Sequence, residues 1–280
     1  MRLSQESLDI PDILRKYGLR PNKKLGQNFL IDQSSLQNVI FAAQINPADT
    51  ILEIGPGLGS LTRLLAQQAF RVVAVEVDAG FIPILNDILA QYPNVEIIHG
   101  DILKLDPARL VPGSGYLVVA NIPYYITSSI IRHLLDTKCL PRRLALTVQL
   151  EVANRICALP GDMSLLALSV QVFGKPTIAA HIPAQAFYPP PVVDSAVVCV
   201  EIFPEPLVPP TQIDLFFRLA KAGFSQKRKT LRNSISGGMG WSKVKTEQLL
   251  LSSGIDPLRR AETLSLEEWQ MLVISSDVKS

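Results

Sequence analysis

The chain has 280 residues, a formal net charge of +2 and 48% hydrophobic residues. Together with a mean hydropathy of +0.24, these values exclude a mostly disordered chain, and the length suits one large domain plus a small one. No apolar stretch approaches the roughly 20 residues that a transmembrane helix needs. The first residues include acids and no apolar segment, unlike a signal peptide. The sequence therefore predicts a cytoplasmic protein without a membrane partner.

Strand-like and helix-like segments alternate between about residues 50 and 200. β-branched and apolar runs predict strands at Ile51–Ile54, Arg71–Val77, Val95–His99, Tyr116–Ala120, Leu144–Gln149, Ser169–Phe173 and Ser195–Phe203. Helical spacing predicts helices that start near Gln33 and at Ser60–Gln68, Phe81–Leu89, Ser128–Leu135 and Glu151–Leu159. Such alternation predicts an α/β domain whose parallel sheet is covered on both faces.

A proline-rich segment, Pro204–Pro210, separates this region from the rest of the chain. Its prolines predict a stiff linker. Helical spacing follows at Ile213–Ala222, Lys227–Ser234, Lys243–Leu251 and Leu266–Val273. We therefore expect a large domain at residues 1–205 and a small all-helical domain at residues 206–280.

The cysteines and histidines show no site-forming pattern. Cys139, Cys157 and Cys199 are far apart, and the three histidines are scattered. This distribution predicts a reduced protein without a disulfide framework or a bound metal.

A glycine-rich segment, EIGPGLG at residues 53–59, begins at the end of the first predicted strand and continues into a loop. Glycines between a strand and a helix let a ligand approach the backbone closely. Ser60 stands where a dinucleotide fingerprint requires its last glycine, so the E-x-G-x-G-x-G spacing favours S-adenosylmethionine (SAM) over NAD. We predict that Gly55 and Gly57 bind the cofactor.

Two acids follow the next two strands. Glu76 ends the second strand, where a carboxylate can accept both ribose hydroxyls of the cofactor. Asp101 follows the third strand and is suited to accept the exocyclic amino group of the cofactor's adenine. Either acid alone is usually a solvated side chain, but the loop followed by both acids predicts a SAM pocket.

The tetrapeptide Asn121-Ile122-Pro123-Tyr124 follows the fourth strand. The side-chain oxygen of Asn121 and the carbonyl of Ile122 can accept the two hydrogens of a base amino group, which favours a nucleophilic, pyramidal nitrogen. Pro123 stiffens the turn, and Tyr124 can stack on a base that has left its surroundings. Phe187 is suited to close the other side of that base. The pattern predicts a catalytic group of these five residues.

Five ordered segments resemble the ribosomal RNA adenine dimethyltransferases, and among them the KsgA-like small-subunit branch: Lys23–Leu30, Leu52–Thr62, Asn121–Ser128, Phe187–Val198 and Phe224–Asn233. The resemblance implies a Rossmann-like class I methyltransferase domain with a mostly parallel seven-stranded sheet. It implies SAM-dependent dimethylation of N6 on two adjacent adenosines in a hairpin near the 3′ end of 16S rRNA, during small-subunit biogenesis. Carried over by position, it assigns the SAM site to Asn28, Leu30, Gly55, Glu76, Asp101 and Asn121.

The sequence departs from the family pattern at three places: Ser129, where relatives often carry proline, Leu150, where lysine is frequent, and Met163–Leu168. None of these positions removes a proposed catalytic group. The departures bear on local loop shape and on RNA contacts.

Other functions stay open at this point. The large-subunit rRNA dimethyltransferases that confer macrolide resistance share the QNFL and NIPY-type motifs, and a DNA adenine methyltransferase is a further alternative. A ribosome-assembly or transcription partner that retains a SAM fold is a non-enzymatic alternative. Ser60 and the lack of a hydride-transfer acid or base disfavour an NAD-linked oxidoreductase.

The positive charge is unevenly distributed. Neither Ile13–Ile31 nor Leu215–Thr246 contains an acid, although both contain several lysines and arginines. Two basic segments beside an adenine-methylating pocket predict phosphate contacts with folded RNA. We expect RNA contacts from Lys23, Lys24, Lys227, Arg228, Lys229 and Arg232, and we expect the protein to act as a monomer.

Overall fold

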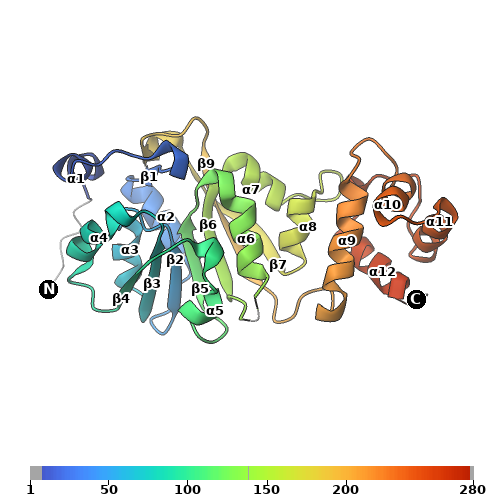
Figure 1. Cartoon of the computed structure of the whole chain (residues 1–280), viewed down its shortest axis with the longest axis horizontal. Coiled ribbons are helices and arrows are strands. Elements are labelled where there is room, and N and C mark those ends of the chain that lie inside the picture. The colour runs from blue at the N-terminus through green and yellow to red at the C-terminus, as the bar shows by residue number, and fades with distance from the viewer. Residues whose placement is uncertain (1–7, 138, 278–280) are drawn as a thin grey trace. The chain divides into compact units, whose positions relative to one another are not determined.

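A computed structural model (Figure 1) describes residues 8–137 and 139–277, apart from the side chains of Lys23 and Asp277. The chain divides into two compact units. The first comprises Met1–Ala153 and Thr177–Ile202, and the second comprises Asn154–Pro176 and Phe203–Ser280. Each unit is described by itself.

A seven-stranded sheet forms the centre of the first unit. Its strands are β2 (Thr50–Ile54), β3 (Arg71–Glu76), β4 (Val95–His99), β5 (Leu117–Asn121), β6 (Arg143–Gln149), β7 (Gly174–Ile182) and β9 (Ser195–Ile202). They lie in the order β4-β3-β2-β5-β6-β9-β7. The first five strands in this order, β4, β3, β2, β5 and β6, are parallel to one another, and β9 is antiparallel to β6. The expected α/β fold with a mostly parallel seven-stranded sheet is confirmed.

The order in which successive strands are added to the sheet reverses between β2 and β5. Strands β3 and β4 lie on one side of β2, whereas β5 and β6 lie on the other. In open α/β sheets, ligands bind beyond the carboxyl ends of the strands at such a switch point. The topology therefore places a candidate site beyond the carboxyl ends of β2, β3 and β5.

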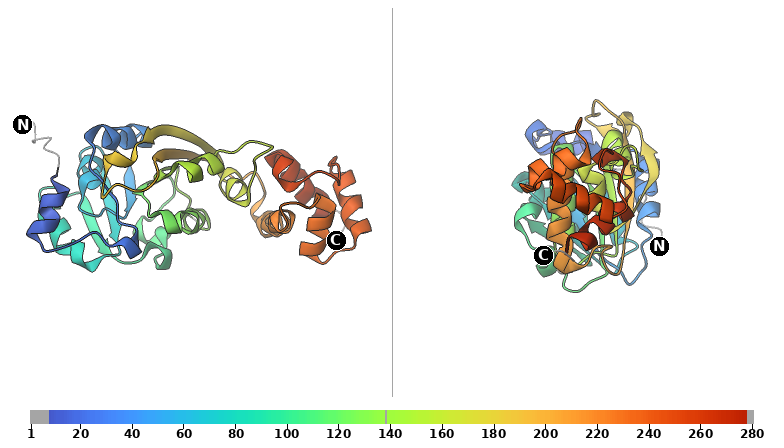
Figure 2. Two further views of the ribbon diagram at one scale, coloured as in Figure 1. Left: turned by 90° about the horizontal axis from the view of Figure 1, so that it is seen from above. Right: turned by 90° about the vertical axis from the view of Figure 1, so that its right-hand side faces the viewer.

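Both faces of the sheet are buried at its central strands. Ile51 and Val72 pack in one cluster with residues of the helices on their face, while the adjacent Leu52 and Val73 point to the opposite face and are also fully buried. This pattern is typical of a parallel sheet between two layers of helices, which Figure 2 shows.

The connecting helices are α2 (Gln33–Ala43), α3 (Ser60–Ala66), α4 (Ile82–Leu89), α5 (Pro107–Leu110), α6 (Thr127–Leu135) and α7 (Leu150–Ile156). Their starts follow from local capping chemistry. Asp32 caps α2 by accepting a hydrogen bond from the backbone N–H of Ser35 at 2.8 Å. Gly59, with φ of 83°, precedes α3 in the left-handed conformation that favours glycine.

An N-terminal arm, which runs from α1 (Ile10–Lys16) to β1 (Phe29–Leu30), packs against the rest of this unit. Its helix α1 buries Ile10 and Leu14 in the core. The short strand β1 pairs with β8 (Phe187–Tyr188), with Leu30 opposite Phe187. This pairing anchors the arm residues that line the site described below.

The second unit is helical. It contains α8 (Leu165–Gln171), α9 (Ile213–Phe224), α10 (Leu231–Met239), α11 (Lys243–Ser252) and α12 (Leu266–Asp277). Its core includes the fully buried Phe216 and Trp269. A side chain at Gly223 would lie 2.5 Å from the Trp269 ring, so this glycine allows α9 and α12 to approach closely.

Two expected elements are wrong. Ser169–Phe173 is not a strand, because Ser169 to Gln171 complete α8, in which Leu166, Ala167, Leu168 and Val170 are buried. The helix expected at Lys227–Ser234 begins only at Leu231, whose N–H donates to the carbonyl of Arg259. Residues 154–176, expected within the first domain, belong to the second unit, because α8 packs in the core that contains Phe216.

Candidate active site

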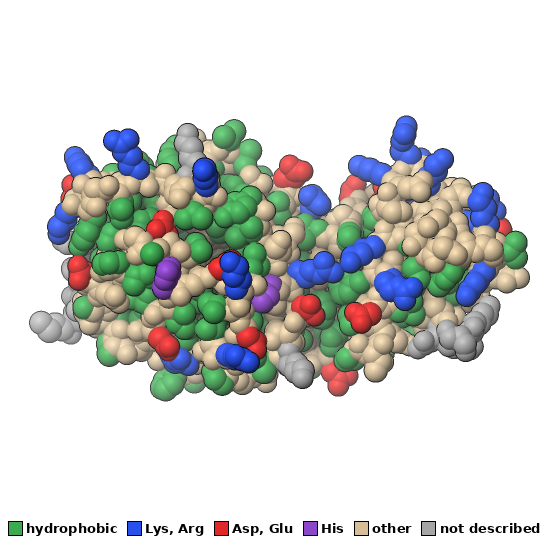
Figure 3. All heavy atoms as spheres, in the orientation of Figure 1, with side chains coloured by type: hydrophobic (Ala, Val, Ile, Leu, Met, Phe, Trp, Pro, Cys, Tyr) green, Lys and Arg blue, Asp and Glu red, His purple; other side chains and the backbone are tan. Residues whose placement is uncertain are grey.

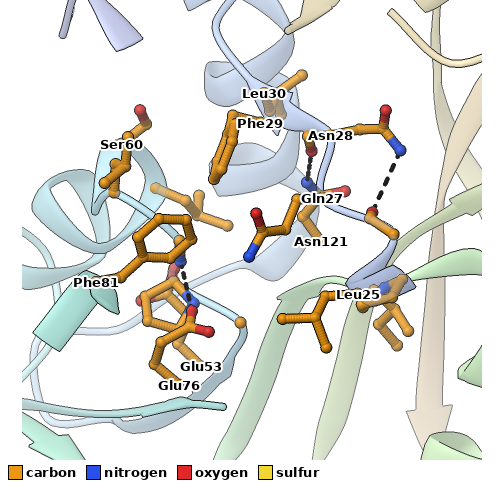
Figure 4. Close-up of a pocket in the computed structure, with 18 of the residues that line it drawn as sticks. Leu25, Gln27, Asn28, Phe29, Leu30, Glu53, Ser60, Glu76, Phe81 and Asn121 are labelled. Atoms are coloured by element: carbon orange, nitrogen blue, oxygen red, sulfur yellow. Dashed lines mark hydrogen bonds between the residues drawn. The ribbon is translucent and has the colours of Figure 1, made fainter. Parts of the chain in front are cut away.

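A pocket lies beyond the carboxyl ends of β2, β3 and β5, and the N-terminal arm forms part of its wall (Figure 4). Many of the expected site residues line it. They are Asn28, Leu30, Gly55, Gly57, Glu76, Asn121, Ile122, Pro123 and Tyr124. The fold thus brings together the glycine loop, one of the two acids and the whole tetrapeptide.

The glycine loop adopts a left-handed backbone conformation, which strains residues other than glycine. Gly55 and Gly57 have φ values of 70° and 59°, in the left-handed region. A Cβ atom on Gly57 would lie 3.0 Å from two ring carbons of Phe29. Gly57 is therefore required both by its conformation and by the arm packed against it.

Glu76 is held at the end of β3 by the backbone. Its carboxylate accepts hydrogen bonds from the N–H of Gly57 at 3.0 Å and from the N–H of Asp78 at 2.8 Å. Burial raises the pKa of Glu76, and these two bonds oppose that shift. Because a carboxylate has about four acceptor positions, two bonds leave capacity for hydroxyl groups of a ligand.

Glu53, at the end of β2, also lines the pocket and is 1% exposed. Its Oε2 atom has no hydrogen-bond partner among the residues that the structure describes. Burial raises the pKa of Glu53 to about 8, although the nearby hydroxyl of Thr62 opposes that shift. Figure 4 shows Glu53 and Glu76 on one side of the pocket and Leu25 on the other. An acceptor buried without a partner is costly, so a donor group of a ligand would stabilise it.

Asn121, the last residue of β5, joins the sheet to the arm. Its side-chain nitrogen donates a hydrogen bond to the carbonyl of Asn28 at 2.9 Å. A second bond ties the arm to the sheet: the side chain of Gln27 donates to the carboxylate of Asp78, just after β3, at 2.8 Å. Since the amide nitrogen of Asn121 is used by the arm, its amide oxygen is oriented by the same bond and can accept from a substrate.

Tyr124 lies in a short 3-10 helix, Tyr124–Ile126, directly after Pro123. Its hydroxyl is 2.6 Å from the hydroxyl of Ser195. Burial raises the pKa of Tyr124, and the bond to Ser195 opposes that shift. Tyr124 therefore lines the pocket while the hydroxyl end of its ring is held by Ser195.

Two expected site residues lie elsewhere. Asp101 caps the turn after β4 by accepting from the N–H of Leu103 at 3.1 Å and lies 3.8 Å from Lys104 Nζ. Phe187 is 2% exposed and packs in the core of the first unit. Neither belongs to the lining of the pocket, and their proposed contacts with adenine rings stay predictions.

The expected RNA-contacting side chains are mostly exposed. Lys24, Lys227, Arg228 and Lys229 face solvent, whereas Arg232 is partly buried and pairs with Glu247 at 3.1 Å. The side chain of Lys23 lies outside the described residues. Figure 3 shows basic side chains gathered over the part of the second unit that contains α9, α10 and α11.

Sequence reasoning missed several residues of the lining, among them Glu53, Gln27 and two aromatic residues. Phe29 and Phe81 pack edge to face, with ring centroids 5.7 Å apart, and both line the pocket with Gln27. Phe29 and Gln27 belong to the QNFL segment, so its resemblance to the family was the available signal. Nothing in the sequence distinguished Phe81 from an ordinary core aromatic.

The lining includes two carboxyl groups, Glu53 and Glu76, and no lysine, arginine or histidine among the residues described. Such a pocket is electrostatically suited to a cationic ligand. Within the same described ranges, no cluster of three metal-ligating side chains and no helix long and apolar enough to cross a membrane is found.

Comparison with known proteins gives consistent results. The profile of the family described as "Ribosomal RNA adenine dimethylase" matches residues 18–275. A "Ribosomal RNA small subunit methyltransferase A" of Dehalococcoides mccartyi is 46% identical over 264 residues, which cover 94% of this chain and 91% of that protein. A protein of the same name from Alkaliphilus oremlandii is 43% identical over 268 residues, with 93% of each chain covered.

Two solved structures are similar over most of the chain. A dimethyladenosine transferase from Plasmodium falciparum has a TM-score of 0.77 at 26% identity and covers 90% of this chain and 98% of its own. The 23S rRNA methyltransferase ErmE has a TM-score of 0.73 at 26% identity, with coverages of 89% and 100%.

Proposed function

Because the chain belongs to the ribosomal RNA adenine dimethylase family, we propose that it dimethylates N6 of two adjacent adenosines near the 3′ end of 16S rRNA, with SAM as methyl donor. The adenosines lie in a hairpin, and the reaction takes place in the cytoplasm on the small ribosomal subunit or its precursor, with the enzyme acting as a monomer. The observation that carries this proposal is one pocket that joins the glycine loop, Glu76 and the tetrapeptide Asn121–Tyr124.

Several features of the pocket support SAM as the ligand. Gly57 leaves the loop backbone open beside Phe29, a space that a Cβ atom would fill. The buried Oε2 of Glu53, unpartnered among the described residues, suits the ammonium group of the cofactor, whose positive charge would lower the raised pKa of Glu53 and favour the charged carboxylate. Glu76 would accept its ribose hydroxyls, and Asn28, Leu30 and Gly55 would complete the site. SAM supplies an electrophilic methyl group.

The tetrapeptide prepares the amino group of the target base. An adenine N6 shares its lone pair with the ring and is a poor nucleophile. The Asn121 oxygen and the Ile122 carbonyl would accept its two hydrogens, which makes the lone pair available. No strong general base is required, because the nitrogen can release its proton to water after methylation. Positioning therefore supplies most of the rate.

The target base must leave its RNA surroundings to enter the pocket. Tyr124 supplies a ring on which the base can stack. The exposed Lys227, Arg228 and Lys229 are suited to RNA phosphates, as is Lys24 in the arm. In this proposal Asp101 would contact the cofactor's adenine and Phe187 the target base.

The decisive experiment is incubation of the protein with SAM and unmethylated small subunits, followed by mass-spectrometric mapping of the modified bases. We expect dimethyladenosine at two adjacent positions near the 3′ end of 16S rRNA. Parallel incubations with 23S rRNA and with duplex DNA distinguish the alternatives. Modification confined to either of those substrates, or no dimethyladenosine at all, would refute the proposal.

A further inference from the structure

A serine far along the chain contacts the tetrapeptide. Ser195 is the first residue of β9 and is completely buried. Its hydroxyl lies 2.6 Å from the hydroxyl of Tyr124. This is a short hydrogen bond between two side chains, of which Tyr124 lines the pocket and Ser195 does not.

The backbone on both sides of Ser195 is fixed. Ser195 lies opposite Gln149 in the β6–β9 ladder. The preceding residue, Asp194, accepts from the N–H of Leu150 at 3.0 Å through its carbonyl and from the N–H of Ala184 at 2.9 Å through its carboxylate. Ser195 is therefore a rigid anchor, tied to the sheet and to the loop before it.

Tyr124 needs such an anchor. It belongs to a single 3-10 turn, and its neighbour Tyr125 is 62% exposed. The hydroxyl of Thr127 lies 3.3 Å from the carbonyl of Tyr124 and fixes the backbone of that turn, but not the ring. A tyrosine ring turns about two side-chain bonds, and a bond to its hydroxyl restrains rotation about the first of them, Cα–Cβ, which sets the position of the ring.

We propose that Ser195 is a positioning residue for methyl transfer, and that it acts through the Tyr124 hydroxyl to hold the ring on which the target adenine stacks. The inference rests on the proposed function. It connects the family-like segment Phe187–Val198 directly to the tetrapeptide, through Ser195 rather than through the buried Phe187.

A double-mutant cycle tests this assignment. Ser195→Ala and Tyr124→Phe each remove one side of the same hydrogen bond and keep the ring. We expect each variant to lower kcat roughly fivefold, which is ~1 kcal/mol of transition-state stabilisation. The double variant is expected to lose no more than either single variant, while the dissociation constant for SAM stays unchanged in all three.

The control is Ser234→Ala, which removes an equally buried hydroxyl that donates to the carbonyl of Thr230 in the helical unit. We expect this variant to retain wild-type kcat. Urea unfolding of all variants separates stability from activity. Coupling between Ser195 and Tyr124 in unfolding free energy without coupling in kcat would show a purely structural bond and overturn the proposal.

Two further outcomes also decide the question. Multiplied losses in the double variant, or unchanged kcat in Ser195→Ala, would overturn the positioning role while the wild type still forms dimethyladenosine. If the wild type forms none on small subunits, the proposed function fails first, and the inference fails with it.

Discussion

Replacement of Gly57 by alanine tests the cofactor pocket most directly. Gly57 has φ of 59°, and alanine in the left-handed region costs ~1 kcal/mol relative to glycine. The new Cβ would also lie 3.0 Å from the Phe29 ring, closer than an ordinary carbon–carbon contact. Phe29 packs against Phe81, and both rings line the pocket. The ring must therefore move where the cofactor would bind.

We expect Gly57→Ala to lower the free energy of unfolding by about 1–2 kcal/mol and to weaken SAM binding about tenfold or more, since each ~1.4 kcal/mol changes a dissociation constant tenfold. Isothermal titration calorimetry with SAM measures the affinity, and urea denaturation measures the stability. The free energy of unfolding reports the backbone strain, and the dissociation constant reports the displaced Phe29 ring. Both are measured on the same protein preparation.

Gly240→Ala is the matched control. Gly240 ends α10 with φ of 68°, and a Cβ there would meet no described atom within 4 Å. It carries the same conformational cost without a contact, so we expect lower stability and unchanged SAM affinity. Wild-type affinity in Gly57→Ala, or an equal loss of affinity in Gly240→Ala, would refute the reasoning.

Three further predictions follow from the site and the basic surface. Asn121→Ala should retain part of the SAM affinity and lose most methyl transfer, measured by calorimetry and by incorporation of labelled methyl groups. Glu53→Gln should flatten the pH dependence of stability: burial raises the pKa of Glu53 to about 8, so the folded state keeps a proton that the unfolded state loses. Wild-type stability should then fall by up to ~1.4 kcal/mol per pH unit between the two pKa values, as urea midpoints at pH 5.5 to 7.5 would show. Changing Lys227, Arg228 and Lys229 together to alanine should weaken binding to small subunits and reduce its salt dependence.

Each of these has a result that contradicts it. Wild-type turnover by the Asn121 variant would exclude the tetrapeptide mechanism, and parallel pH profiles for wild type and the Glu53 variant would exclude a neutral Glu53. For the basic surface, the control removes the same charge at exposed positions outside the two basic segments: Lys104, Arg109 and Lys175. An equal loss of binding in both triple variants would show a general charge effect.

The sheet and the pocket-forming loops were predictable because their signals are local. The strand expected at Val95–His99 matches β4 exactly, and the glycine loop lies between β2 and α3 as expected. Helix α8 was mistaken in part for a strand because its sequence, LLALSVQ, is apolar and short, and periodicity alone does not separate a buried helix from a buried strand in such a segment.

Long-range pairing and burial were not predictable from local patterns. Nothing near Leu30 indicates that it pairs with Phe187, so the arm's place against the pocket required the folded chain. The sequence contains Glu53 within its glycine motif, but its burial and unpartnered oxygen depend on neighbours from other elements. The resemblance to a family anticipated Asn28 and Leu30, whereas physical reasoning from the residues alone did not.

The composition of the helical unit has a consequence for protein engineering. Residues 154–176 belong to that unit together with 203–280, and α8 shares a core with Phe216 and Leu219 of α9. A fragment cut at the proline-rich segment would leave α9 without one wall of its core. Chimeras that exchange the helical unit between relatives therefore need three crossover points in the gene, before Asn154, after Pro176 and before Phe203. A single C-terminal swap should yield an unstable hybrid.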